Sequence, residues 1–352
     1  MNSREVILAQ FDPNSPGMAG QIFGLPFTEE NAQVIIIPVP WEVTVSYAGG
    51  TATAPKAILD ASTQVDLYMR NVKEAWKLGI YMLPFPEKIH EENKTLRKLA
   101  EQHIEALEAG NTEVNKVILD QVNKGCENLN VYVKNLAGKY LKEEKLVGLL
   151  GGDHSTPLGF IQALSEQHDR FGILAIDAHA DLRKAYEGFT YSHASIMYNA
   201  LKLPAVAKLV QVGIRDFCEA EQEVVYNAKG RIKVFYDEDI KYAQYQGKTW
   251  SSICEAIINE LPDKVYISLD IDGMDPKLCP HTGTPVAGGF EFHQVTLLLS
   301  LLARSGKKII GFDLNEVAPG ETDEWDANVG ARLLYQLSNW MGVSQEKLQY
   351  GN

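Results

Sequence analysis

The chain has few cysteines, no long apolar run and no excess of positive charge. Its four cysteines, Cys126, Cys218, Cys254 and Cys279, are scattered without the paired spacing of a disulfide framework or a thiolate metal site. No apolar segment is long enough to cross a bilayer, and no apolar secretion-signal core follows Met1. The net charge of −13 over 352 residues disfavours nucleic acid and anionic membranes as partners. We therefore expect a cytoplasmic protein that attracts a small cationic molecule.

Short apolar runs alternate with segments of helical periodicity along most of the chain. Strands are expected at residues 34–40, 78–83, 146–150, 171–176, 208–212, 232–236, 265–270 and 308–314. Helices are expected at residues 54–62, 158–167, 219–228, 253–261 and 291–304. This order predicts an α/β fold with three αβα layers around a central, mainly parallel sheet. No linker or repeat divides the chain, so residues 1–352 are expected to form one domain.

Two regions depart from this alternation. Residues 1–33 show little periodicity and contain Pro13, Pro16 and Pro26, so we expect them to wrap the surface without forming a helix. Residues 91–140 form a long helical segment that is interrupted at residues 110–112, where Thr112 can cap the second helix. Amphipathic helices of this kind usually cover a sheet face, and contact between subunits is the alternative.

The stretch Ile176-Asp-Ala-His-Ala-Asp181 places three ionisable side chains at every second position after an expected strand. If the chain stays extended, Asp177, His179 and Asp181 leave on one face, because side chains alternate along a strand. Two carboxylates held this close repel each other, and their burial is costly. A divalent cation removes that conflict, so we expect a metal site here.

Two other expected strands end in the same kind of residue. Asp270 and Asp272 repeat the alternate spacing after residues 265–269, and Asp153 and His154 follow residues 146–150 in a glycine-opened turn. An isolated Asp-x-Asp is usually a turn or a helix cap, and an isolated histidine usually has a structural role. Because parallel strands end at one edge of a sheet, the three groups can instead meet in one crevice.

The donor types indicate which metal the site would take. Carboxylate oxygens with some imidazole suit manganese best, and nickel, cobalt and zinc are the alternatives. No cysteine lies in the three groups, which argues against a structural thiolate zinc site. The two histidines and four aspartates exceed what one ion with an open position needs. Two ions that share carboxylates use these ligands better.

Three motifs resemble those of the ureohydrolase family, which includes arginases and agmatinases. They are Gly151-Gly-Asp-His-Ser155, Asp177-Ala-His-Ala-Asp181 and Ser268-Leu-Asp-Ile-Asp-Gly-Met-Asp-Pro276. Residues 49–58 are also similar to an N-terminal agmatinase motif, and residues 91–140 look longer than the matching part of compact members. The resemblance implies an arginase-like αβα fold, two Mn²⁺ ions, with Ni²⁺ or Co²⁺ as alternatives, and a homo-trimer or homo-hexamer.

The family pattern, carried over by position, implies a ligand set for each ion. One ion would be held by His154, Asp177, Asp181 and Asp270, and the other by Asp177, His179, Asp270 and Asp272. The resemblance thus implies that Asp177 and Asp270 bridge the two ions.

Two further residues complete the expected catalytic set. His193 lies in Tyr191-Ser-His-Ala194, where the family has a proton shuttle, and a histidine that only packs the loop is the alternative. Glu316 follows the strand at residues 308–314, where the family has a carboxylate that binds the guanidinium, and Asp313 is expected to be structural. Asp181 would orient a hydroxide formed between the ions, and His193 would protonate the departing amine.

The resemblance also bears on the substrate. Arginase-type sequences have Asn where this chain has Arg183 and Asp where it has Cys218, so arginine is disfavoured. Residues 181–183, 191–194 and 282–289 are similar to agmatinases, so we expect hydrolysis of agmatine to putrescine and urea. If Arg183 points into the pocket, a guanidino acid or formiminoglutamate becomes the better substrate, whereas a surface or interface ion pair leaves agmatine. Free guanidine is a further alternative.

Two other function classes remain. Metal-dependent deacetylases use a related fold, but they would not require the Glu316 motif or the full set of ligands for two ions. A non-catalytic paralogue would not need to keep the ligands together with His193 and Glu316. Metal content and urea release separate these classes from a ureohydrolase.

Overall fold

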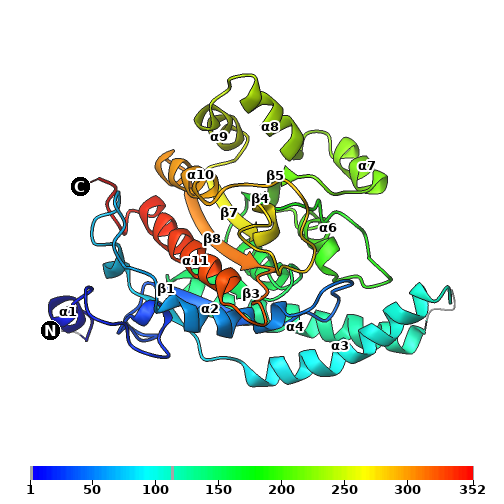
Figure 1. Cartoon of the computed structure of the whole chain (residues 1–352), viewed down its shortest axis with the longest axis horizontal. Coiled ribbons are helices and arrows are strands. Elements are labelled where there is room, and N and C mark those ends of the chain that lie inside the picture. The colour runs from blue at the N-terminus through cyan, green and yellow to red at the C-terminus, as the bar shows by residue number, and fades with distance from the viewer. Residues whose placement is uncertain (1–2, 112–114, 352) are drawn as a thin grey trace.

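An eight-stranded parallel sheet forms the centre of the structure, a computed structural model that describes residues 3–111 and 115–351 (Figure 1). The strand order is β2-β1-β3-β8-β7-β4-β5-β6, and every neighbouring pair is parallel. The strands are β1 (Val34–Val39), β2 (Ile80–Met82), β3 (Leu146–Gly151), β4 (Phe171–Ile176), β5 (Val206–Ile214), β6 (Ile232–Tyr236), β7 (Lys264–Asp270) and β8 (Lys308–Asn315).

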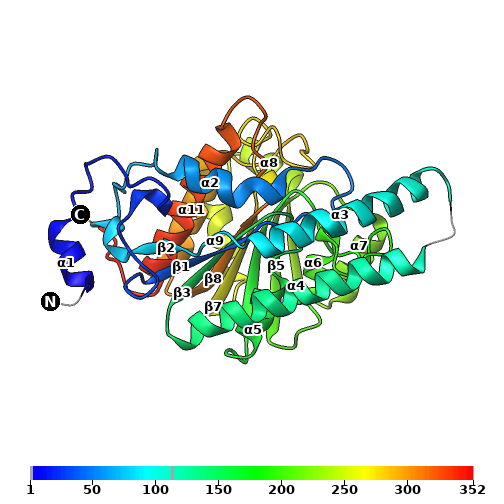
Figure 2. The same ribbon diagram turned by 90° about the horizontal axis from the view of Figure 1, so that it is seen from below.

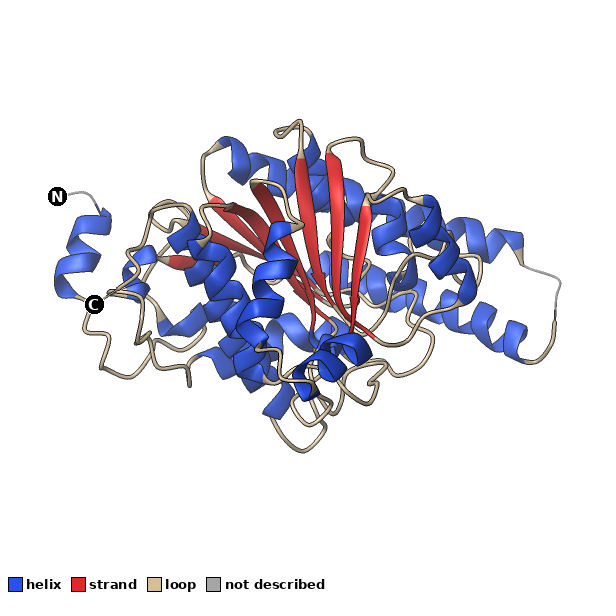
Figure 3. Cartoon of the chain, turned by 90° about the horizontal axis from the view of Figure 1, so that it is seen from above, coloured by secondary structure: helices blue, strands red, loops and turns tan. Residues whose placement is uncertain are grey.

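Helices cover both faces of this sheet, so the predicted αβα fold is confirmed (Figure 2 and Figure 3). One layer contains α2 (Ala54–Ser62), α9 (Trp250–Asn259), α10 (Phe292–Arg304) and α11 (Trp325–Ser344). The other contains α3 (Glu87–Glu108), α4 (Lys116–Lys142), α5 (Leu158–Ser165) and α6 (Ile196–Ala200). Beyond β2 lies α1 (Ser3–Gln10), and near β5 and β6 lie α7 (Glu219–Asn227) and α8 (Asp237–Tyr245).

The first 33 residues differ from the prediction. Helix α1 forms in this segment and ends before its first proline, so the prolines limit the helix without preventing it. Ile22, Phe23, Leu25 and Phe27 are almost completely buried, so the segment is part of the core. The expectation of a surface segment was wrong because this apolar run is short and contains Gly24 and Pro26, so its pattern did not indicate a buried segment.

Helix α11 had no counterpart among the expected elements, because it is enclosed on nearly every side. Leu334 and Met341 are fully buried, and so are the polar side chains of Ser338 and Asn339. Ser338 Oγ donates to Leu334 O at 2.8 Å, and Asn339 Nδ2 donates to Tyr335 O at 2.9 Å, so the helix itself accepts from both donors. A helix buried all round has no apolar stripe that a periodicity argument can detect.

The long helical segment forms α3 and α4, which lie side by side (Figure 2). Thr112, the expected cap, lies outside the described residues, and the N-cap of α4 is Asn115, whose side chain accepts from Ile118 N at 3.3 Å. Despite the length of these two helices, no helix in the described ranges is apolar enough over a sufficient length to cross a bilayer.

The contact between α4 and α5 gives a test of the packing. A Cβ added at Gly159 of α5 would lie 2.2 Å from Asn130 O and 2.9 Å from Lys134 N, both backbone atoms of α4. Because a helix would have to move, we expect Gly159→Ala to lower the free energy of unfolding by about 1–3 kcal/mol. A Cβ at Gly138 of α4 would meet nothing within 4 Å. Gly138→Ala should therefore gain roughly 0.5–1 kcal/mol from helix propensity. Denaturant titration measures both, and equal stabilities would contradict the packing.

Candidate metal centre

The candidate site lies at the carboxyl ends of four adjacent central strands, β3, β8, β7 and β4. His154 follows β3, residues 177–181 follow β4, Asp270 ends β7 and Glu316 follows β8. Strand β8 separates β3 from β7, so Glu316 enters between the groups that the other strands supply. The sheet thereby brings together residues up to 162 positions apart in the sequence.

The turn after β3 depends on a close backbone approach. A Cβ on Gly152 would lie 2.0 Å from Trp41 O, so only glycine lets the chain pass this close to the end of β1. Asp153 N donates to the same Trp41 O at 2.8 Å, and Ser155 N donates to Asp153 Oδ1 at 2.9 Å. These bonds fix the turn and direct the intervening His154 toward the other strands.

A first cluster surrounds His154 Nδ1. This nitrogen lies 3.1 Å from Asp177 Oδ2, 3.1 Å from Asp181 Oδ2 and 3.2 Å from Asp270 Oδ2. All four side chains are buried, yet His154 Nδ1 and Asp177 Oδ2 have no hydrogen-bond partner. Burial, followed by repulsion from Asp181 and Asp272, raises the pKa of Asp177 to about 7. Burial opposes charge on His154, but the three carboxylates raise its pKa well above its ordinary value. The pocket therefore requires positive charge at this point, which a metal ion supplies as well as a proton does.

A second cluster shares Asp177 with the first. His179 Nδ1 lies 2.9 Å from Asp272 Oδ2 and 3.8 Å from Asp177 Oδ1. Burial opposes charge on both partners, but their attraction lowers the pKa of Asp272 to about 2 and raises that of His179 to about 10. The donors of each cluster can hold a metal ion, and Asp177 turns one oxygen toward each. Carboxylate oxygen and imidazole nitrogen fit a divalent cation.

Behind His154 lies a relay whose role the sequence did not indicate, although Ser268 begins one of the three motifs. His154 Nε2 is 2.8 Å from Ser268 Oγ, and Ser268 Oγ donates to Asp313 Oδ1 at 3.0 Å. Because the serine proton goes to Asp313, Nε2 donates to the serine, and Nδ1 is the nitrogen that can bind a metal ion in place of a proton. The alternate spacing along β7 places Ser268 on the same side as Asp270, which is the signal that could have revealed it.

Removing this relay should weaken metal binding. In Ser268→Ala, the His154 Nε2–H loses its acceptor and the proton can move to Nδ1, so we expect an affinity for Mn²⁺ about 10–100-fold lower. Equilibrium dialysis with metal analysis measures the change. Ser338→Ala is the matched control, because Ser338 is equally buried but bonds only within α11. Equal affinity in both variants would show that the relay does not orient His154.

The backbone is strained at two of the predicted catalytic residues. Asp181 and Glu316 have φ values of +53° and +61°, a region that costs a non-glycine residue about 1–3 kcal/mol. Asp181 O accepts the N–H of Met197 at 3.1 Å. Glu316 N donates to Gly152 O at 2.8 Å, and Thr282 Oγ1 donates to Glu316 O at 2.7 Å. These bonds hold both residues in the conformation that turns them toward the cluster.

The Glu316 carboxylate lies beside the turn after β3. Its Oε1 accepts from His154 N at 2.7 Å, and the residue is only 7% exposed. Burial, then repulsion from Asp270 and Asp153, raises its pKa well above the ordinary value. A cation bound beside Glu316 would favour the ionised form.

The loop that contributes Thr282 is anchored to α11. The buried Asp326 accepts from His281 N at 3.1 Å through Oδ1, and its Oδ2 lies 2.8 Å from His281 Nδ1. Because Thr282 follows directly, this anchor fixes the hydroxyl that bonds to Glu316 O. Asp326 could not be assigned from the sequence, since it belongs to the helix that was not expected.

His193 lies at the start of a short 3₁₀ turn, His193–Ser195. Its N–H donates to the buried Thr44 Oγ1 at 3.4 Å, and its ring is edge-on to Tyr186 with centroids 6.2 Å apart. Burial lowers the pKa of His193 to about 4, although the Asp181 charge acts in the opposite direction. The imidazole of His193 is therefore neutral near pH 7, and the Asp181 charge favours its protonation.

Arg183 forms an ion pair with Glu221 of α7. Its Nε lies 3.8 Å from Glu221 Oε2, and its guanidinium lies 4.9 Å from the centroid of the Tyr186 ring. The Glu221 carboxylate is buried and accepts the N–H groups of Leu182 and Cys218, each at 3.0 Å. Arg183 lines a cavity of about 800 Å³ whose described lining contains none of the candidate ligands. Of the two positions considered for Arg183, the structure has the ion pair.

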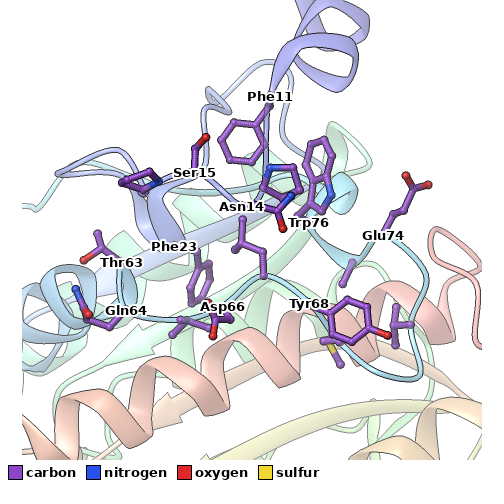
Figure 4. A pocket seen from close by; sticks show the side chains of 18 of the residues that line it. Phe11, Asn14, Ser15, Phe23, Thr63, Gln64, Asp66, Tyr68, Glu74 and Trp76 are labelled. Carbon is purple, nitrogen blue, oxygen red and sulfur yellow. The ribbon is translucent and has the colours of Figure 1, made fainter.

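A further cavity lies away from the metal ligands, beside the N-terminal segment (Figure 4). Its volume is about 1090 Å³, and the side chains of Phe11, Phe23, Tyr68 and Trp76 surround it. None of the candidate catalytic or metal-binding residues is among its described lining. Cavity size therefore does not indicate the chemical site, which is recognised by the convergence of ionisable groups.

The protein is an α/β protein whose parallel sheet carries two clusters of carboxylates and imidazoles at its carboxyl edge. Such a site can hold metal ions. Residues 32–338 match the model of the arginase family, and the chain belongs to this family. The resemblance seen in the three motifs is thus confirmed, and the chain is a metal-dependent guanidino hydrolase.

Related proteins and solved structures cover nearly the whole chain. The N(1)-aminopropylagmatine ureohydrolase of Thermus thermophilus is 32% identical over 316 residues, which are 89% of this chain and 92% of that protein. The enzyme of the same name from Synechocystis is 29% identical and covers 90% of this chain and 92% of its own. The agmatine ureohydrolase of Thermoplasma volcanium has a TM-score of 0.69 at 21% identity and covers 97% of this chain and 99% of its own. The arginase of Bacillus subtilis has a TM-score of 0.62 at 21% identity, over 87% of this chain and 98% of its own. These structures share the fold.

Proposed function

We propose that the protein is a dinuclear manganese hydrolase that cleaves the guanidino group of an agmatine-type amine to urea and an amine. The observation that carries this proposal is the pair of buried clusters that share Asp177, with Glu316 at their edge. In this proposal His154, Asp177, Asp181 and Asp270 hold one ion. The other ion is held by Asp177, His179, Asp270 and Asp272.

Glu316 is proposed to bind the guanidinium. Its Oε1 is held by His154 N, so the carboxylate is fixed beside the cluster. A planar guanidinium can donate two parallel hydrogen bonds to a carboxylate, which orients the carbon as well as binding the charge. The positive substrate would also offset the repulsion that raises the pKa of this group.

The ions, when bound, supply hydroxide near neutral pH by lowering the pKa of water. Asp181 accepts a hydrogen bond from this nucleophile and orients it toward the guanidinium carbon. His193 relays a proton from solvent to the departing amine, and although burial lowers its pKa, the Asp181 charge favours the protonated imidazole. Asp181 and His193 act on opposite sides of the reaction, one on the nucleophile and the other on the leaving group.

Replacement of His193 should separate proton transfer from metal binding. We expect His193→Ala to reduce kcat by about 10²–10⁴-fold, since no other group is proposed to protonate the amine. Metal content should stay at the parent value because His193 is not a proposed ligand. Urea release and metal analysis measure the two effects, with the exposed His293→Ala as control. Undiminished turnover at unchanged metal content would refute the proposed role.

The substrate is proposed to be a cationic guanidino amine. Because Arg183 pairs with Glu221, its charge is partly offset and does not require an acidic substrate. The net charge of −13 favours a cation. Agmatine remains our first candidate, and N1-aminopropylagmatine is the second because two relatives that cover most of the chain carry that name. Removal of urea from the second substrate would leave a longer polyamine.

A substrate series tests this assignment. We expect the Mn²⁺-loaded protein to release urea from agmatine or N1-aminopropylagmatine with a kcat/KM at least about 100-fold higher than from acids, since an acidic protein disfavours a negative charge on the substrate. The comparison includes arginine, guanidinobutyrate, guanidinopropionate, guanidine and, by its ammonia or formamide, formiminoglutamate. Preference for an acid would contradict the proposal, and Arg183→Gln would then show whether this residue contacts the substrate.

The proposal also covers the localisation, the oligomeric state and the domain organisation of the protein. We propose a cytoplasmic homo-trimer or homo-hexamer in which residues 1–352 act as one domain. The four cysteines are free thiols, which supports a reducing compartment. One sheet collects strands from β1 to β8, which supports a single domain.

A further inference from the structure

The hairpin formed by α3 and α4 bonds to the loop that delivers His193, and does not only cover the sheet. We call residues 182–192 the catalytic loop. His103 of α3 is almost completely buried, and its Nε2 donates to Glu187 O in this loop at 2.8 Å. The ring of His103 also packs edge-on against Phe189, with centroids 5.3 Å apart. Helix α3 thus holds the loop by a polar and an apolar contact.

Helix α4 holds the same loop through Asn123. The side chain accepts from Thr190 N at 2.8 Å through Oδ1 and donates to Gly188 O at 3.4 Å through Nδ2. The two helices therefore bond to the loop backbone at three residues, Glu187, Gly188 and Thr190. If α3 and α4 only covered the sheet, polar side chains such as His103 and Asn123 would be expected to face solvent.

These bonds hold a tight turn in a demanding conformation. Tyr186 N donates to Phe189 O at 3.2 Å, and Phe189 N donates to Tyr186 O at 2.8 Å. Between them, Glu187 and Gly188 have φ values of +53° and +87°. Two successive positive φ values are typical of a type I′ turn, and glycine accepts them more readily than glutamate. The contacts with the hairpin stabilise a turn that Glu187 alone would disfavour.

The turn at residues 186–189 contacts His193 directly, so its position affects the imidazole. Tyr186, its first residue, presents its ring to the His193 ring with centroids 6.2 Å apart and an interplanar angle of 79°. At the other end of the turn, Thr190 O accepts from Asn199 Nδ2 at 2.8 Å, which ties the loop to α6. A displacement of the turn would therefore change the surroundings of the imidazole.

Helix α3 also anchors a second loop that contacts His193, at residues 43–45. Arg97 of α3 donates through Nη1 to Val43 O at 3.3 Å and also to Val45 O. Thr44, between these two carbonyl groups, is fully buried and accepts the His193 N–H at 3.4 Å. Both loops that meet at His193 are thus anchored to one pair of helices.

We propose that the α3–α4 hairpin positions His193 for proton transfer, with His103 and Asn123 as positioning residues that act through the turn at residues 186–189. This inference rests on the proposed function, because proton transfer by His193 is part of it. It assigns a specific task to the long helical segment, beyond covering the sheet or contacting a second subunit.

The test compares the parent with His103→Ala/Asn123→Ala in the Mn²⁺-loaded full chain. We expect amide hydrogen exchange of residues 183–193 to rise about tenfold or more, since the loop loses its anchors. The modification of His193 by diethylpyrocarbonate, followed by mass spectrometry, should also become faster. With the preferred guanidino amine, kcat should fall about tenfold, while KM and metal content change less than twofold. A purely structural role would lower the melting temperature and leave kcat unchanged.

Matched variants on the same helices are the controls. Asn128→Ala on α4 and His90→Ala on α3 remove an asparagine and a histidine that do not bond to the loop, and they should match the parent in exchange and kcat. His103→Gln keeps a donor at similar reach and should recover most of kcat. If the double variant does not fold, Asn123→Asp replaces it, because this change removes only the donor to Gly188 O.

Two results would overturn the inference. One is a double variant with unchanged exchange in residues 183–193, and the other is increased exchange with kcat within twofold of the parent. If the parent releases urea from no compound, the proposed function fails separately. The modification rate of His193 then decides the inference: faster modification supports it and an unchanged rate refutes it.

Discussion

The burial of negative charge at the carboxyl edge of the sheet is the constraint on which the rest of the structure depends. Four aspartates and Glu316 approach one another where little water can screen them, and burial raises the pKa of Asp177, Asp270 and Glu316. Two histidines face these carboxylates, but the unpaired His154 Nδ1 and Asp177 Oδ2 show that hydrogen bonds alone do not satisfy the site. Metal ions and a cationic substrate would both offset the negative charge of these buried carboxylates.

The surrounding residues hold this charge in place without taking part in the reaction. Ser268 and Asp313 fix the proton of His154, and Asp326 fixes the loop that bonds to Glu316 O. The strained backbone at Glu316 is held from both sides in the same way. The site is therefore rigid because each reactive group is bonded to an element that is itself buried.

The sequence predicted the parts that depend on local spacing, and it could not predict those that depend on distant contacts. Apolar runs located the strands, and alternate spacing predicted that Asp177, His179 and Asp181 converge. The positive φ that turns Asp181 toward the cluster could not be predicted from this spacing. In contrast, Thr44 and His103 are single residues without a motif, and their partners lie far along the chain. Helix α11 was missed for the opposite reason, since burial on nearly all sides removes the periodic pattern.

The position of β8 has a consequence for the order of assembly. This last strand lies between β3 and β7, so it alone joins β2-β1-β3 to β7-β4-β5-β6. A chain emerging from the ribosome can form two half-sheets, but their inner edges stay unpaired until residues Lys308–Asn315 have been made. His154, which follows β3, is kept apart until then from the four aspartates, which all follow or end β4 and β7. Truncation before β8 would therefore leave two separate edges prone to aggregation, in place of a smaller enzyme.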